Sequence, residues 1–239
     1  MTALVIHGSE GRMGRRLMAL AEEHGFELLG GIDQDTELSV VESLLSRADL
    51  VIDFSLPAGL DALLIALEGR GLPLVSGTTG LSPAQHAALE RYSDEAAVLW
   101  ASNMSRGIVV LRALVEEAAR RLPEWDAELV EVHHRRKVDA PSGTALTLAE
   151  GLVAARGEGQ IERGRRGQGA RRPASVGIQS LRGGSVVGEH RVSFFHDGEQ
   201  VHLSHVAESR DQFVRGALCA GRWLMGREPG IYAIEETVD

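Results

Sequence analysis

Short apolar strands alternate with helical segments from Ala3 to Ala101, and this alternation restricts the fold more than any other feature of the chain. Strands and helices in alternation form a parallel sheet covered by helices, because each helix returns the chain to the same end of the sheet. Ligands of such sheets bind at the carboxyl ends of the strands, so we expect a binding crevice at that edge. The expected strands are 3–7, 26–32, 49–54, 72–76 and 97–101, and the expected helices are 12–24, 58–69 and a segment that starts at Pro83.

The first strand runs into a glycine-rich turn, GSEGRMG, that opens the first helix. A strand, a glycine turn and a helix in this order are the context of a dinucleotide-binding fingerprint. Gly8 and Gly11 would let the backbone approach a pyrophosphate, and Gly14 would let the helix pack closely on the strand. Arg12 could lie beside the phosphates or be an exposed arginine of the first turn. The alternative is a tight turn that binds nothing, but the context favours a Rossmann-type α/β domain.

Polar residues follow the later strands of the same domain. Asp33 ends the second strand about 20 residues after the glycine turn, where an acidic side chain binds the adenosine ribose hydroxyls. Gln34 comes next, and no nearby arginine or lysine could neutralise a 2′-phosphate, so NADH is favoured over NADPH. The turns at 77–79 and at Asn103 are candidates to contact the nicotinamide half of the cofactor, although a polar loop without a ligand would have the same composition.

The segment EVHHRRKVDAPSGTA, residues 131–145, gathers basic side chains at the end of an expected strand, 127–132. Neighbouring strand residues point to opposite faces, so His133 shares a face with Glu131 while His134 points away. The two histidines are therefore a poor pair of metal ligands but can serve two separate roles. A basic run of this kind can also be a solvated face or a phosphate-contacting patch.

A proline turn follows the basic run, and Gly143 and Thr144 open the next expected helix, 144–156. The start of a helix presents backbone N–H groups and the positive end of the helix dipole. Proton donors beside such a helix start suit a small anion that is protonated during a reaction. A solvated face would need neither the proline turn nor the glycine.

From Gly107 onward the strands and helices no longer alternate. A Gly/Arg-rich segment, 157–173, lacks periodicity and is expected to be a mobile loop, either a flap that clamps an anion or a solvated linker. Strands joined by short glycine turns then predict two antiparallel hairpins in an open sheet. The final helix is expected to return to the first domain. These expected elements are a helix at 108–121, strands at 174–182, 185–196 and 200–207, and a helix at 210–225.

Composition excludes several classes of protein. The formal net charge of −9 argues against nucleic acid as the main partner. Cys219 is the single cysteine, which excludes an internal disulfide and a cysteine zinc site. No apolar run reaches membrane-spanning length, and the chain starts with a strand instead of a signal peptide. We therefore expect a cytoplasmic protein that has no membrane partner.

The pattern E-x-H-H-x-x-K-x-D-A-P-S-G-T-A resembles the signature of the 4-hydroxy-tetrahydrodipicolinate reductase (dihydrodipicolinate reductase) family of the lysine and diaminopimelate pathway. The GxxGRMG turn, the GTTG turn, the Asn103 loop and the segment VVGEHRVSFFHDGEQVHLSHVAESRDQFVRGAL are also similar to this family, so the resemblance covers nearly the whole chain. It implies NAD(P)H-dependent reduction of a small dicarboxylate, 4-hydroxy-tetrahydrodipicolinate, to tetrahydrodipicolinate. We expect NADH to be the preferred cofactor, with NADPH as a possible one.

The resemblance also implies two domains and a set of site residues. A Rossmann domain would contain 1–104 plus 209–239, and a central α+β domain with an open mixed or antiparallel sheet, 105–208, would bind substrate and form a homotetramer. By matched motif, His133 performs acid–base chemistry and Lys137 donates a proton, and no metal is implied. Substrate binding falls on His134, Gly143 and Thr144. Cofactor contacts fall on Gly8, Ser9, Glu10, Gly11, Arg12, Met13, Asp33, Gly77, Thr78, Thr79, Ala101, Ser102, Asn103 and Met104.

The chain departs from the family pattern at three places: Glu10 inside the glycine turn, a short segment between Asp33 and Asp49, and Arg106 where an apolar residue is common. We expect the Glu10 carboxylate to point to solvent, because it would repel a pyrophosphate.

Two other functions are kept as alternatives, although the sequence argues against each of them. A related oxidoreductase of another amino or imino acid, such as an aspartate dehydrogenase, conflicts with the complete signature. A nucleotide-sensing module without catalysis conflicts with the presence of both His133 and Lys137. A hydrolytic or metal enzyme has little support, since there is no HExxH motif and the remaining histidines are scattered along expected strands, where most of them are expected to be structural. These are His190, His196, His202 and His205.

Overall fold

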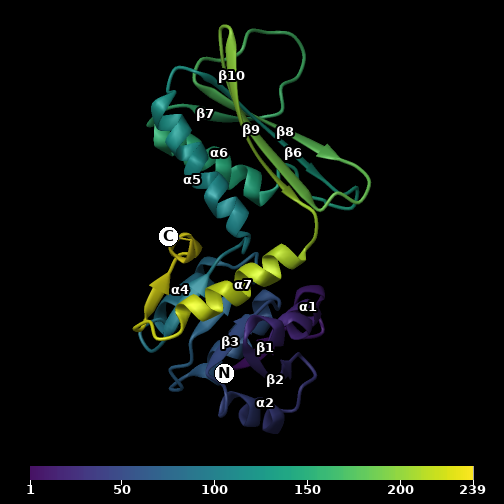
Figure 1. Ribbon diagram of the computed structural model, residues 1–239, viewed down its shortest axis with the longest axis vertical. Helices are drawn as coiled ribbons and strands as arrows, with labels where there is room; N and C mark the ends of the chain where they lie inside the picture. Colours follow the sequence, from purple (N-terminus) through teal and green to yellow (C-terminus); the bar gives the residue numbers. More distant parts are fainter. Residues whose placement is uncertain (239) are drawn as a thin grey trace. The chain divides into compact units, whose positions relative to one another are not determined.

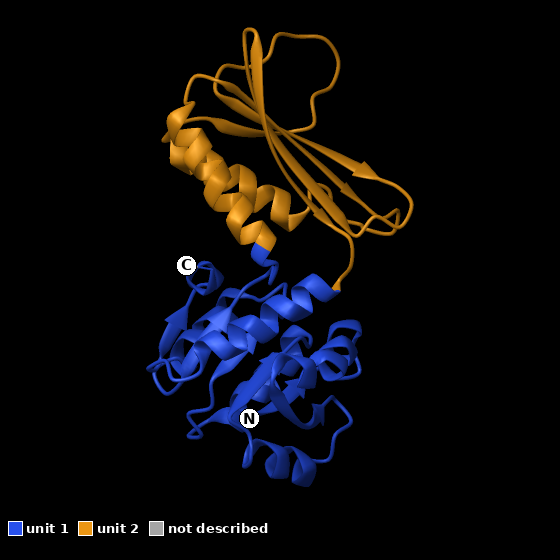
Figure 2. Cartoon of the chain, viewed as in Figure 1, with its two compact units in different colours: residues 1–106, 211–239 blue, residues 107–210 orange. Residues whose placement is uncertain are grey.

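The computed structural model describes residues 1–238, which divide into two compact units (Figure 1, Figure 2). The first unit combines residues 1–106 with 211–238, and the second contains residues 107–210. Within residues 1–238, no helix is both long and apolar enough to cross a membrane.

Six parallel strands form the sheet of the first unit, in the order β11-β5-β4-β3-β1-β2. The strand order reverses beside β1, which is where open α/β sheets bind their ligands. The predicted α/β class is confirmed. The strands are β1 Thr2–His7, β2 Phe26–Ile32, β3 Leu50–Asp53, β4 Leu74–Ser76, β5 Ala97–Trp100 and β11 Gly230–Tyr232. The helices are α1 Arg12–Leu20, α2 Leu38–Leu45, α3 Pro57–Leu67, α4 Pro83–Tyr92 and α7 Asp211–Leu224, with short 3-10 helices η1 Glu22–His24 and η2 Ile234–Thr237.

Helix α7 packs on β3, β4 and β5, although it follows them by more than a hundred residues in the chain. It buries Val214, Leu218 and Leu224 completely, and burying each of these side chains contributes roughly 1.5–3 kcal/mol. Helix α7 can lie this close to the loop after β5 only because residue 216 is a glycine, since a Cβ on Gly216 would lie 1.7 Å from the Met104 carbonyl oxygen. Helix α2 was not expected from the sequence. Its first turn leaves Leu38 exposed and it buries only Leu45, so it carries little amphipathic signal.

The second unit has a five-stranded mixed sheet in the order β10-β9-β6-β8-β7. Its central strand, β6, pairs with β9 in an antiparallel sense and with β8 in a parallel sense. The strands are β6 Asp126–His133, β7 Gln160–Arg163, β8 Ser175–Arg182, β9 Gly188–His196 and β10 Glu199–Ala207, and the helices are α5 Arg106–Arg121 and α6 Gly143–Arg156.

The prediction of two hairpins is half wrong. Strands β9 and β10 form an antiparallel hairpin, but β8 and β9 do not pair, because β6 is inserted between them. The glycine turn between β8 and β9 therefore crosses over β6 instead of closing a hairpin. Length and turn composition cannot distinguish these two connections.

The Gly/Arg-rich segment is also more ordered than expected, since Gln160–Arg163 forms β7 and pairs with β8. Four residues with a single apolar side chain, Ile161, are too few to show a period. Arg171 fixes the returning chain through ion pairs to Asp126 at 2.8 Å and Glu128 at 3.4 Å.

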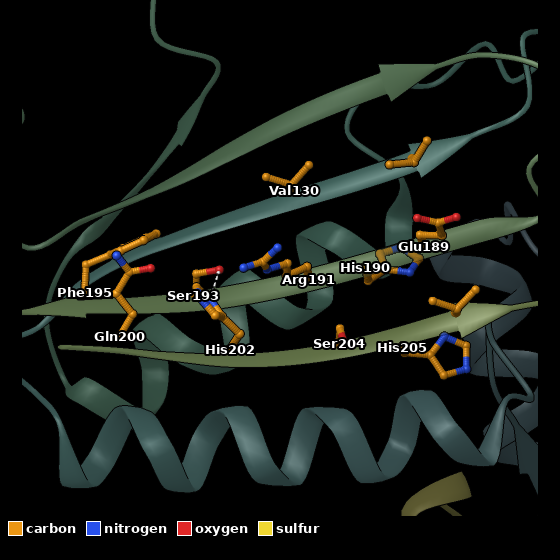
Figure 3. A pocket seen from close by; sticks show the side chains of 12 residues that line it. Val130, Glu189, His190, Arg191, Ser193, Phe195, Gln200, His202, Ser204 and His205 are labelled. Atoms are coloured by element: carbon orange, nitrogen blue, oxygen red, sulfur yellow. Dashed lines mark hydrogen bonds between the residues drawn. The ribbon is translucent and has the colours of Figure 1, made fainter.

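Helices α5 and α6 cover one face of this sheet, and the other face is open. Ala127 and Leu129 of β6 point into the helix-covered core, and Val130 and Val132 alternate to the open face. A hollow of about 530 Å³ lies on that open face, lined by β6, β9 and β10 (Figure 3). The lining includes apolar Val130, Val132, Phe195 and Val206 and polar Arg191, Ser193, Gln200 and His202.

Candidate active site

The glycine-rich turn between β1 and α1 has a backbone that only glycine permits. Gly8 has φ of 76°, and a Cβ there would lie 2.7 Å from the Phe54 carbonyl oxygen. A Cβ on Gly14 would lie 2.1 Å from the Gly8 carbonyl oxygen, so α1 can start this close to β1 only without a side chain. Gly11 and Arg12 are exposed, which leaves the N-terminal end of α1 accessible. The cradle therefore fits a pyrophosphate.

Asp33 lies against this turn at the end of β2. Its Oδ2 accepts the Glu10 N–H at 2.9 Å and its Oδ1 accepts the Gln34 N–H at 2.9 Å. These backbone hydrogen bonds lower the pKa of Asp33, so the carboxylate is ionised at neutral pH. The Glu10 side chain is 72% exposed and pairs with Arg15, so the expectation that it points to solvent is confirmed. Asp33 both closes the glycine turn and presents an ionised carboxylate beside it.

A second carboxylate, Asp53, is fully buried at the end of β3. It accepts hydrogen bonds from the His7 Nδ1 at 2.8 Å, the Ser55 N–H at 3.1 Å, the Ser76 hydroxyl at 2.7 Å and the Thr78 hydroxyl at 2.8 Å. Burial opposes its ionisation, but the hydrogen bonds, led by that of His7, outweigh burial and lower the pKa of Asp53. This network joins the carboxyl ends of β1, β3 and β4 beneath the predicted cofactor site.

The turn after β4 is held in place from both sides. The Thr78 hydroxyl binds Asp53, and the Thr78 carbonyl accepts the Trp100 indole N–H at 2.9 Å. Gly77 faces the Phe54 ring, where a Cβ would lie 2.4 Å from a ring carbon. Thr79 is exposed, so it is the side chain of this turn that a ligand can reach.

The loop after β5 also contains both buried residues and an exposed residue that a ligand can reach. Ser102 is exposed, while Ala101 and Met104 are buried. Asn103 is half-buried, and its side-chain oxygen accepts the Ser105 N–H at 2.9 Å. The Met104 side chain belongs to the core, so any contact of Met104 with a cofactor would involve its backbone.

In the second unit a buried carboxylate, Glu131, connects the residues of the signature segment. Its Oε2 lies 2.5 Å from the His133 Nδ1, as the shared strand face predicts. Arg182 donates to both carboxylate oxygens, at 2.8 and 2.7 Å, and also to the Asp139 carbonyl at 2.6 Å. The Ser142 N–H donates to Oε1 at 3.2 Å. One side chain thus contacts β6, β8 and the loop that leads into α6.

The charges of this cluster determine the ionisation of its members. Burial would raise the pKa of Glu131, but hydrogen bonds from Arg182, Ser180 and His133 outweigh burial and lower it to about 2. Burial lowers the pKa of His133, and the charges of Lys137 and Arg182 lower it further, while Glu131 partly opposes them. At neutral pH the site therefore contains an ionised carboxylate and a neutral imidazole.

The start of α6 is fixed to the same cluster. The Ser142 hydroxyl caps the helix by accepting the Ala145 N–H at 3.2 Å, and it lies 3.2 Å from the His190 Nε2. Burial is the main cause that lowers the pKa of His190 to about 4, and the adjacent His133, with ring centroids 5.2 Å apart, adds to it. Gly143 is exposed, and no atom lies within 4 Å of a Cβ placed there. The helix start is open to a small anion.

Lys137 and His134 lie on the loop that follows β6. The Lys137 ammonium pairs with the Asp139 carboxylate at 2.8 Å, and the backbone N–H of Lys137 donates to the His134 carbonyl at 3.0 Å. The His134 Nδ1 is buried without a hydrogen-bond partner in the described part of the chain. Within residues 1–238, no three His, Cys, Asp or Glu side chains are arranged to hold a metal ion.

Sequence reasoning missed four residues of these sites: Arg182, His190, His7 and Asp53. Asp53 ends a buried apolar strand, and a carboxylate in that position is a signal that could have been used. Arg182 reaches Glu131 across 51 positions of sequence, and no local pattern marks that contact.

A parallel sheet with a glycine-rich first turn, joined to a unit that holds a histidine–carboxylate pair beside a helix start, defines a two-unit Rossmann-type protein, the class that includes nicotinamide-dependent oxidoreductases. The family model for the N-terminus of dihydrodipicolinate reductase matches residues 2–104, and the model for its C-terminus matches residues 107–238. The chain belongs to the dihydrodipicolinate reductase family.

Curated relatives agree with this assignment. A 4-hydroxy-tetrahydrodipicolinate reductase of a Nitratiruptor species is 42% identical and covers 97% of this chain and 96% of its own. The protein of the same name from Xanthomonas euvesicatoria is 44% identical and covers 98% of this chain and 97% of its own. A solved structure of dipicolinate-bound dihydrodipicolinate reductase from a Paenisporosarcina species superposes with a TM-score of 0.80 at 22% identity and 99% coverage of both chains, which shows the shared fold.

Proposed function

We propose that this chain catalyses the NAD(P)H-dependent reduction of 4-hydroxy-tetrahydrodipicolinate to tetrahydrodipicolinate in lysine and diaminopimelate biosynthesis. The observation that carries the proposal is the contiguous cluster of His133, Lys137 and the α6 start around Glu131. Relatives that are 42% and 44% identical over nearly the whole chain bear the name of this reaction.

The chemistry needs groups of the kind that the cluster holds. Replacing a hydroxyl by hydrogen consumes one hydride and one proton and releases water. When bound, the reduced nicotinamide supplies the hydride. The ammonium of Lys137 is the proton donor in this proposal, and the neutral imidazole of His133 accepts a hydrogen bond or a proton. The exposed start of α6 at Gly143 and Thr144 receives a substrate carboxylate, with His134 as a further contact.

The first unit supplies the cofactor site in this proposal. Gly8 to Met13 hold the pyrophosphate, and the exposed Thr79 and Ser102 are available to the nicotinamide half. We propose that NADH is preferred over NADPH, because the ionised Asp33 would repel a 2′-phosphate. Both Asp33 oxygens already accept a backbone N–H, but each carboxylate oxygen can accept a further hydrogen bond from a ribose hydroxyl.

The test is a coupled assay in which the unstable substrate is generated in place and oxidation of NADH and NADPH is followed separately. We expect turnover with both and a higher kcat/KM with NADH. Asp33→Ala should weaken NADH binding and narrow the ratio between the two cofactors. Gln34→Ala is the matched control for the neighbouring side chain. An unchanged ratio in Asp33→Ala would remove Asp33 from the explanation, and NADH binding without any turnover would favour a nucleotide-sensing module.

We further propose that the chain assembles as a homotetramer through the open face of the second sheet and that it acts in the cytoplasm. Apolar side chains on an otherwise uncovered sheet face support the first part. A small dicarboxylate is the proposed partner in catalysis, and the net charge of −9 does not favour nucleic acid.

A further inference from the structure

Glu131 is the only side chain in the described chain that contacts the imidazole of His133, Arg182 and the backbone start of α6 at the same time. It is fully buried, and it is not among the residues that the signature assigns to catalysis or binding. Burying a carboxylate costs free energy, and the donors around it must compensate its charge within the protein. A charge that is buried at this cost and surrounded by this many donors indicates that its position matters.

We propose that Glu131, clamped by Arg182, is a positioning residue that holds His133 in the tautomer protonated at Nδ1 and fixes the start of α6 beside it. This inference rests on the proposed function and adds two residues to it. It assigns His133 the role of acceptor and leaves the donor role to Lys137.

The tautomer follows from the donors and acceptors. A carboxylate that receives two guanidinium N–H groups is ionised and can only accept, so the hydrogen between Glu131 and His133 belongs to the His133 Nδ1. In the neutral ring the Nε2 then carries the lone pair. A Cβ on Gly188 of β9 would lie 3.1 Å from that Nε2, so the glycine leaves room beside it.

Burial and two nearby cations favour the neutral form of His133, and Glu131 opposes them. Lys137 of the following loop and Arg182 of β8 lower the pKa of His133, as burial does, and His190 of β9 packs against the ring. Asp139 does not offset them, because its carboxylate is paired with Lys137. A neutral His133 with its hydrogen on Nδ1 has no proton to give from Nε2.

The same contacts connect the histidine to the helix start. Glu131 accepts the Ser142 N–H, Arg182 holds the Asp139 carbonyl, and Ser142 in turn caps α6. Loss of the Glu131 charge would therefore disturb both the acceptor and the anion-binding helix end, which predicts effects on kcat and on the KM for substrate but not on NADH affinity.

The decisive variant is Glu131→Gln, which keeps the shape of the side chain and removes its charge. We expect kcat to fall about 100-fold, as misplacement of a catalytic group commonly does. Because Glu131 is the group that raises the pKa of His133, the acidic limb of the kcat/KM profile should move to lower pH in the variant. NADH affinity should stay unchanged. Glu128→Gln is the matched control, since Glu128 lies on the same strand but on the opposite face, paired with Arg171.

A readout that does not depend on turnover is the nitrogen NMR spectrum of the histidine rings, with His133 assigned by comparison with His133→Asn. We expect the wild-type signal to show a neutral ring protonated at Nδ1 at pH 7, and the Glu131→Gln signal to show a mixture of tautomers. A wild-type ring protonated at Nε2, or a Glu131→Gln activity loss that only follows the loss of folded protein, would overturn the inference. An inactive wild-type enzyme with the expected tautomer would overturn the proposed function and leave the positioning role intact.

Discussion

His133 and His134 are adjacent in the chain but lie in different surroundings. The His133 ring is buried against a carboxylate, an arginine and a second histidine. The His134 Nδ1 is buried without a hydrogen-bond partner in the described chain. His133 is the last residue of β6, whereas His134 is the first residue of the loop that follows, so the two side chains leave the chain in different directions. This difference gives one residue a fixed tautomer and leaves the other with an unused polar atom that a ligand could satisfy.

Removing the two proton-handling side chains should separate chemistry from cofactor binding. We expect His133→Ala combined with Lys137→Ala to reduce kcat by at least about 100-fold, because acid–base groups contribute that much or more. NADH affinity, measured by fluorescence titration, should remain close to that of the wild type. The same substitution at His196, which is exposed at the end of β9, serves as the control. Loss of NADH binding in the double variant would show that the site has been assigned to the wrong part of the chain.

At the residue scale, the sequence alone revealed the side chains that share a strand or a turn. That Glu131 and His133 share a strand face followed from the two-residue period, and the exposure of Glu10 followed from charge repulsion. Arg182 and His190 were missed because they reach the site from β8 and β9, and nothing in their local sequence records which strand lies next to β6.

At the element scale, the glycine turn shows how tightly a local motif can limit substitution. Gly14→Ala would place a Cβ 2.1 Å from the Gly8 carbonyl oxygen and force α1 away from β1. We expect a loss of about 1–3 kcal/mol in the free energy of unfolding and weaker NADH binding. Thermal melting and NADH titration measure the two effects. Gly169→Ala, which meets no atom within 4 Å, should change neither, and equal stability of the two variants would contradict the explanation.

Elements with a clear period were predicted well, and the connections between them were not. The strand at 26–32 matches β2 at both ends, and the helix at 144–156 differs from α6 by one residue. The hairpin expected from β8 to β9 failed because strand order depends on which neighbours bury a shared core. Val176 and Val192 belong to the same buried core as Leu129 of the intervening β6, and this shared core cannot be read from either strand alone.

At the scale of the whole molecule, the open sheet face predicts the state of assembly. Light scattering should give a mass four times the 25.7 kDa of one chain. Val206→Glu places a charge on an exposed valine of that face and should dissociate the assembly, since buried unpaired charges oppose association. Ile65→Glu, on an isoleucine of α3 in the first unit that is also exposed, is the control that should leave the mass unchanged. A monomeric wild type would remove the tetramer from the proposal.

The first unit is assembled from the two ends of the chain, and this has a consequence for its synthesis. Strand β5 pairs with β11, and α7 covers β3, β4 and β5, yet both partners follow the entire second unit in the sequence. When residues up to 210 have left the ribosome, the second unit can be complete, while the first unit still exposes an unpaired edge strand and the apolar surface that α7 covers in the folded protein. Residues 1–106 therefore precede the second unit in synthesis but complete their fold after it, and until α7 and β11 arrive they expose surface that is prone to aggregation.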